Sequence, residues 1–164
     1  ADAVYLKTLK YQAEDFVPVM ACPSQVDKIR NVTEVEGTVI DQVFLGSCTN
    51  GRLEDLRSAA EVLDGKKVAP FVKMIVTPAS RKVYEEALRE GILEKLIEAG
   101  AIVTHPGCGL CCGRTGGILS DGERVVATNN RNFLGRMGTS KVEIYLASPK
   151  TAAACAIAGK IVNP

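Results

Sequence analysis

The densest chemistry in this sequence lies in HPGCGLCCG, residues 105–113, where three cysteines fall within five positions. Thiols spaced this closely bind metals or carry redox chemistry, because thiolate sulfur is both a soft ligand and a nucleophile. The glycines around them let the backbone come close to a bound group and leave amides free to donate hydrogen bonds to sulfur. The motif therefore predicts a metal or redox site whose remaining ligands come from elsewhere in the chain.

The thiol motif alone leaves several kinds of site open. A Cys-x-x-Cys pair such as Cys108 and Cys111 occurs both in zinc sites and in redox dithiols. A structural zinc ion needs four ligands, yet the sequence has no second such pair and only one histidine, His105. A histidine before Pro-Gly is typical of a turn rather than of a ligand. A thioredoxin-like dithiol would lack its usual strand–helix context and would not explain the third thiol, Cys112.

A second signal is NNRNFLGRMG, residues 129–138, in which Arg131 and Arg136 alternate with Asn130 and Asn132. The planar guanidinium fork binds carboxylates through two parallel hydrogen bonds, and asparagine adds neutral donors and acceptors. Taken alone, such arginines are typical of a solvated surface. Beside a thiol cluster they predict a clamp for a carboxylate substrate.

The elements that would position these residues alternate between strand and helix from residue 41 onward. This alternation predicts an α/β fold with a mostly parallel sheet. Ser148 followed by Pro149 is typical of the start of a final helix. The expected strands lie in 41–50, 71–80, 101–109, 123–133 and the first part of 142–162. The expected helices lie in 53–65, in 81–100 as two short helices with Gly91 and Gly100 as C-terminal caps, and in the rest of 142–162.

Ligands of an open parallel sheet bind beyond the carboxyl ends of its strands. The segments that leave the expected strands are rich in glycine, polar residues or cysteine, and parallel strands would bring them to one rim. Cys48 would then meet the cluster at 108–112, although it lies 60 residues before Cys108. Cys48 also lies between a strand and a helix start, where a helix N-terminus stabilises a thiolate.

Composition limits the classes of function. The chain has 164 residues, 46% hydrophobic and 24% charged, which fits one globular domain. The net charge of +1, without a basic block, argues against nucleic acid or an anionic membrane as the main partner. No apolar run approaches the ~20 residues of a membrane helix. We expect residues 41–164 to form the domain and residues 1–40 to be an edge strand or a linker leading into it.

The six cysteines do not suggest a disulfide framework, because a chain this long and apolar needs no covalent staples and shows no sign of secretion. We therefore expect a reducing, cytoplasmic setting. Cys22 follows an apolar run and Cys155 lies in an alanine-rich segment, so both are interpreted as buried packing residues.

Four stretches in order, FLGSCTNGRLEDLRSAA, HPGCGLCCG, SDGERVVATNNRNFLGRMG and YLASPKTAAACAIAGKI, give the chain a close resemblance to the aconitase superfamily. Within it, the chain resembles the large subunits of 3-isopropylmalate dehydratase and homoaconitase. The resemblance implies a three-layer aconitase-like domain with helices flanking the sheet. It also implies a [4Fe-4S] cluster held by Cys48, Cys108 and Cys111, whose fourth iron has no protein ligand and is left open for substrate.

The resemblance further implies a reaction and partners. The family dehydrates and rehydrates a 2-hydroxy acid, with Arg131, Arg136 and Asn130 matching substrate-binding residues. Its acid–base residues come from other domains of the large subunit and from a small, swivelling subunit, so this chain is expected to be a cluster-binding part that is inactive alone. Cys112 departs from the family, which has a small or apolar residue there, but the spacing favours Cys111 as the ligand.

Overall fold

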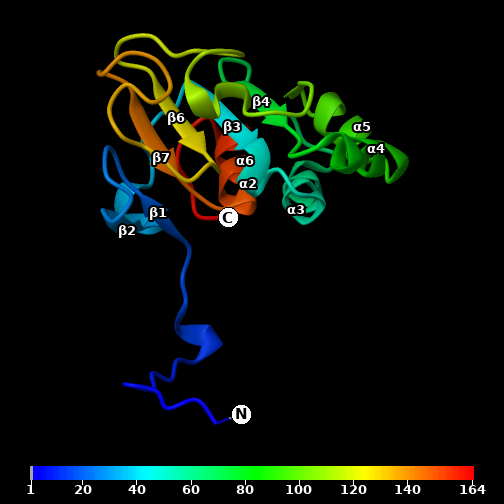
Figure 1. The fold of residues 1–164 in the computed structure, drawn as a ribbon. Helices are drawn as coiled ribbons and strands as arrows, with labels where there is room; N and C mark the ends of the chain where they lie inside the picture. The colour runs from blue at the N-terminus through cyan, green and yellow to red at the C-terminus, as the bar shows by residue number, and fades with distance from the viewer. Residues whose placement is uncertain (1) are drawn as a thin grey trace.

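The computed structural model describes residues 2–164, and in them seven strands form one sheet in the order β2-β1-β7-β6-β3-β4-β5 (Figure 1). Strands β3 to β7 pair in parallel, whereas β1 is antiparallel to both β2 and β7. The predicted α/β fold with a mostly parallel sheet is confirmed. The strands are β1 Val19–Ala21, β2 Ile29–Asn31, β3 Gln42–Gly46, β4 Lys73–Thr77, β5 Ile102–Val103, β6 Arg124–Ala127 and β7 Glu143–Leu146.

Two helix ends coincide with signals read from the sequence. Ser148 caps the final helix, since its Oγ accepts a hydrogen bond from the Thr151 amide at 3.2 Å and Pro149 follows in the first turn. Gly91, at φ +71°, separates the two helices expected in residues 81–100. The α-helices are α1 Val32–Val35, α2 Ser47–Asn50, α3 Leu53–Leu63, α4 Arg81–Arg89, α5 Ile92–Glu98 and α6 Pro149–Ala158; the 3-10 helices are η1 Ala13–Asp15 and η2 Gly109–Cys112.

The two faces of the sheet pack against different elements. Successive residues of a strand point to opposite faces, so neighbouring residues belong to different cores. On one face Val43 and Leu45 pack in a core with α3, α5 and α6. On the other face Phe44 packs with Leu110 of η2 and with Met137 from the loop before β7. The third layer is therefore built from η2 and long loops, which are also the segments that carry the candidate site.

Residues before the parallel sheet are divided between an arm and two strands. Residues 2–18 run away from the body of the chain, with large apolar side chains such as Leu6 and Phe16 exposed (Figure 1). The segment expected as an edge strand forms β1, and β2 lies outside it at the edge of the sheet. Within the described part of the chain, no helix has the length and apolar character needed to cross a bilayer.

The strand order reverses at β3, and this reversal locates the rim that carries the candidate site. Strand β3 is followed in space by β4 and β5 on one side and by β6 and β7 on the other. Such a reversal creates a crevice beyond the carboxyl ends of the two central strands, where ligands of open α/β sheets bind. The Gly46 amide donates to Thr128 Oγ1 at 2.8 Å, and Asn50 Nδ2 donates to the Thr128 carbonyl. These bonds join the segments that follow β3 and β6.

Candidate functional site

Cys48 reaches the rim through a sharp turn between β3 and α2. Gly46 has φ +124° and ψ −132°, a region that favours glycine, and Ser47 has φ +75°. Ser47 is completely buried, whereas Cys48 is exposed. The positive φ of a buried, non-glycine residue indicates that packing around the turn fixes the start of α2, and with it the position of Cys48.

The turn fits only because glycine leaves room for the end of β4. A Cβ on Gly46 would clash with the Thr77 carbonyl, and one on Gly51 would lie 2.5 Å from the same oxygen. A Cβ on Gly109 would lie 2.5 Å from Thr77 Oγ1. The end of β4 is thus packed tightly between the Cys48 turn and the start of the second thiol segment.

The second thiol segment forms η2, which contacts α2 across the rim. Cys108 and Cys112 are exposed, and Cys111 is buried with 8% of its surface accessible. The structure therefore brings together the two segments that carry Cys48 and the 108–112 cluster, as expected from parallel strands. Which thiols act as ligands stays a prediction.

The donor set fits an iron–sulfur cluster in type. All six cysteines are free thiols. Across residues 2–164, no three side chains of His, Cys, Asp or Glu gather closely enough to hold a single metal ion. Cysteine thiolates are the usual ligands of a [4Fe-4S] cluster, so free thiols on this rim would fit such a group by their chemistry.

Arg136 lies beside a thiol and has a buried side-chain nitrogen without a hydrogen-bond partner. Its Nη2 donates to Cys111 Sγ at 3.4 Å, and its guanidinium carbon lies 5.3 Å from the centre of the Phe133 ring. Its Nε is buried, and no hydrogen-bond acceptor for it is found in the described part of the chain. A buried charged donor without a partner, beside a thiol, is suited to an anionic group such as a sulfide cluster or a carboxylate.

Arg131 and Asn130 lie on the same rim, just after β6, and both are exposed. Arg131 Nη1 donates to the Asn130 carbonyl at 2.8 Å, and Asn129 Nδ2 donates to the Arg131 carbonyl at 2.9 Å. The predicted pair of arginines is therefore present at the rim, with Arg136 facing a thiol and Arg131 folded back on its own loop.

Asn132 has a structural role that the sequence reasoning missed. It is 1% exposed, and its Nδ2 donates to the carbonyls of Cys22 at 2.8 Å, Gln25 at 3.2 Å and Ile144 at 3.4 Å. It thereby ties the arginine loop to the segment after β1 and to β7. No sequence signal marks it, because its acceptors are backbone carbonyls far away in the chain.

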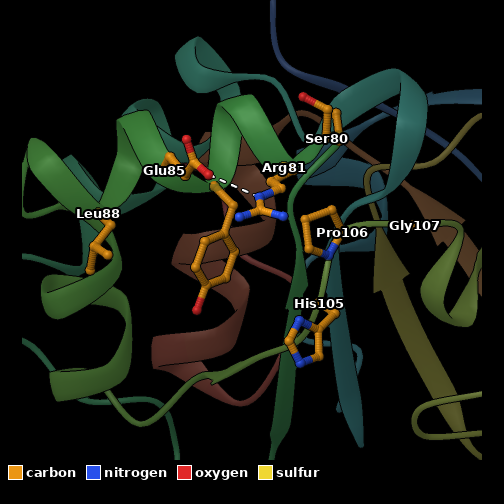
Figure 2. Close-up of a pocket in the computed structure, with 9 residues that line it drawn as sticks. Ser80, Arg81, Glu85, Leu88, His105, Pro106 and Gly107 are labelled. Atoms are coloured by element: carbon orange, nitrogen blue, oxygen red, sulfur yellow. Dashed lines mark hydrogen bonds and ion pairs between the residues drawn. The ribbon is translucent and has the colours of Figure 1, made fainter.

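Two pockets flank the His105 turn. One, of about 450 Å³, opens beside η2 and is lined in part by Thr77, Cys108 and Cys112. The other, of about 670 Å³, lies between the His105 turn and α4, where Arg81 pairs with Glu85 at 2.9 Å (Figure 2). His105 is exposed, lies in the loop that follows β5 and lines both pockets.

Cys22 and Cys155 are buried. Burial raises the pKa of both thiols, that of Cys155 to about 11. Burial and a raised pKa leave a thiol unreactive, which agrees with the interpretation of these two cysteines as packing residues.

The comparison with known proteins agrees with this arrangement. The model of the aconitase family (aconitate hydratase) matches residues 1–159. The homoaconitase large subunit of Thermus thermophilus is 53% identical over 163 residues, and 3-isopropylmalate dehydratase large subunit 1 of Methanopyrus kandleri is 55% identical over 163 residues. The probable 3-isopropylmalate dehydratase large subunit of Methanothermobacter thermautotrophicus is 52% identical over the same length.

Each of these alignments covers 99% of this chain and 39% of the relative. The chain thus spans about two-fifths of the length of the curated relatives it matches. Because the family model matches nearly the whole chain, and the thiol and arginine segments meet on one rim of the sheet, the chain belongs to the aconitase family.

Proposed function

We propose that this chain is the cluster-binding part of the large subunit of a [4Fe-4S] hydro-lyase that interconverts 2-isopropylmalate and 3-isopropylmalate in leucine biosynthesis. Residues 41–164 form the cluster-binding domain in this proposal, and residues 1–40 lead into it. The observation that carries the proposal is the contact between α2 and η2, which brings the Cys48 segment to the Cys108–Cys112 segment. The similarity to several 3-isopropylmalate dehydratase large subunits supports the reaction.

The residues proposed to hold the cluster are Cys48, Cys108 and Cys111. Held by these residues, a cluster would supply Lewis-acid chemistry toward the hydroxyl and a carboxylate of the substrate. Arg136 already donates to Cys111 at 3.4 Å, so its guanidinium is near enough to stabilise the negative charge of the site. Its Nε is buried and has no acceptor in the described part of the chain, so one donor stays available for a bound anion.

Substrate carboxylates are proposed to bind Arg131 and Arg136, with Asn130 as a neighbouring contact. Arg131 is exposed, and its hydrogen bond to the Asn130 carbonyl is local, so the side chain exchanges it for a carboxylate at little cost. A charge-assisted, two-point contact of this kind fixes the orientation of a hydroxy acid as well as its affinity.

The partners in this proposal are the other domains of the large subunit and a small, swivelling subunit in a cytoplasmic heterodimer. By resemblance to the family, the acid–base groups come from those partners, so the chain alone is expected to be inactive. A homoaconitase large subunit is the second candidate, because a relative with that name is 53% identical, against 55% for the dehydratase relative. Measurable isomerisation of isopropylmalate by the isolated chain would contradict the proposal that the acid–base groups come from the partners.

The proposal is tested by anaerobic reconstitution with iron and sulfide, followed by metal and acid-labile sulfide analysis and EPR. We expect about four irons with sulfide per wild-type chain. Cys48→Ser should lose the cluster, whereas Cys112→Ser is the matched control, because Cys112 is also exposed and directly follows Cys111 but is not a proposed ligand. One zinc ion without sulfide would support a structural metal module instead, and loss of the cluster in Cys112→Ser would exchange the roles of Cys111 and Cys112.

A further inference from the structure

The segments that build the rim contain basic residues and no acidic ones. Residues 99–120 and 125–142 include three arginines and no aspartate or glutamate, although the chain has 19 acidic residues in total. Two of these arginines, Arg131 and Arg136, belong to the site proposed above. The third is Arg114, two residues after Cys112. A surface with one sign of charge attracts ligands of the opposite sign.

The arginines differ in how their charge is neutralised. Four arginines elsewhere in the fold, Arg57, Arg81, Arg89 and Arg124, have an ion pair with a carboxylate, whereas Arg30 and Arg52 have none within residues 2–164. Within residues 2–164, no carboxylate lies within 4 Å of the Arg114, Arg131 or Arg136 guanidinium. Arg131 and Arg136 have the other partners described above. Arg114 is exposed, and its side chain has no hydrogen-bond partner in the described chain.

The backbone holds Arg114 next to Arg136. Gly113 has φ +65°, and a Cβ there would clash with the Arg136 carbonyl oxygen. At the other end of the same loop, the Leu119 amide donates to the Met137 carbonyl at 2.9 Å. The loop 113–119 is therefore packed at both ends against 136–137. Like charges on adjoining segments repel each other, and an anion bound between them removes this repulsion.

We infer that Arg114 is a further substrate-binding residue, which adds a third guanidinium to the rim for a hydroxy acid with two or three carboxylates. The identity of the ligand as a hydroxy acid rests on the proposed function. The carboxylate-binding role rests on the charges and contacts of this chain. An arginine that is only solvated on a loop would leave the binding of carboxylates unchanged, which makes the two interpretations separable.

The test is a titration of the cluster-free 164-residue chain with tricarballylate, a carboxylate probe without a hydroxyl, followed by calorimetry at two ionic strengths. Arg114→Gln is expected to weaken binding about tenfold, because it removes one charge-assisted hydrogen bond. Arg114→Lys should recover part of the affinity, since lysine keeps the charge and loses the fork. Arg89→Gln is the control for net charge, because Arg89 lies at the end of α4 and its side chain is 71% exposed.

Equal affinities of the wild type and Arg114→Gln would overturn the inference, and so would equal losses in Arg114→Gln and Arg89→Gln. The inference would also be overturned if the wild-type chain bound no tricarballylate at a concentration of about 10 mM. Because the titration needs no cluster, its result is independent of the iron and sulfide analysis. A chain that takes up a cluster but binds the probe without Arg114 refutes this inference alone, and a chain that binds the probe through Arg114 but takes up no cluster refutes the proposed function alone.

Discussion

Gly46→Ala is the substitution that most directly tests how the fold builds the rim. Gly46 has a backbone conformation that side chains rarely adopt, which costs about 1–3 kcal/mol for alanine. The added Cβ would also clash with the Thr77 carbonyl, and relief of that clash must separate the ends of β3 and β4. Such a separation strains the bond from the Gly46 amide to Thr128 Oγ1, and a buried donor left unpaired costs about 1–3 kcal/mol. The free energy of unfolding should therefore fall by about 2–6 kcal/mol.

Gly65→Ala is the matched control, because Gly65 also has a positive φ, +67°, but a Cβ there meets nothing within 4 Å. This substitution should cost only the strain of the left-handed backbone, about 1–2 kcal/mol. Urea unfolding followed by circular dichroism measures both values. Similar losses in the two variants would refute the reasoning, because they would mean that the crowded turn before Cys48 carries no more strain than an open surface turn.

Two further predictions concern the arginine loop and a buried thiol. Asn132→Ala should lower the free energy of unfolding by about 2–4 kcal/mol, because it leaves buried backbone carbonyls without a donor, whereas Asn130→Ala at the exposed neighbour should change it by less than about 0.5 kcal/mol in the same urea titration. The pKa of Cys155 is raised from 9.0 to about 11 in the fold, so the stabilisation that it gives is complete below pH 9 and is lost as the pH rises to 11. Relative to Cys155→Ala, the wild type should lose roughly 2–3 kcal/mol between these pH values, and parallel pH profiles would contradict this.

Much of the fold could be predicted because its signals are local. The alternation of apolar runs with amphipathic segments specified β3, α3, β4, α4, α5, β6 and α6 in order. Capping residues marked the ends of helices, as Ser148 and Gly91 illustrate. The thiol and arginine motifs marked the candidate site because their residue types are rare and chemically specific, and together they also indicated the family.

Other features depend on packing between distant segments and have no local signal. The sheet could have placed β6 beyond β4, yet its position on the other side of β3 is what creates the crevice at Cys48. Asn132 looks like one more polar residue of the arginine motif. Its side chain instead donates to the Cys22 and Ile144 carbonyls and so joins the arginine loop to two distant segments.

The sequence by itself determined the elements, the thiols and arginines available for chemistry, and membership of the family, since each follows from residue types and their spacing. The tertiary structure brings α2 to η2, as the parallel strands predicted, and it alone decided that Arg136 faces Cys111 and that Arg114 is held beside Arg136 without a carboxylate partner. The physical reason is that spacing along the chain fixes local geometry, whereas proximity across the rim follows from the order of the strands and from close contacts that glycine alone permits.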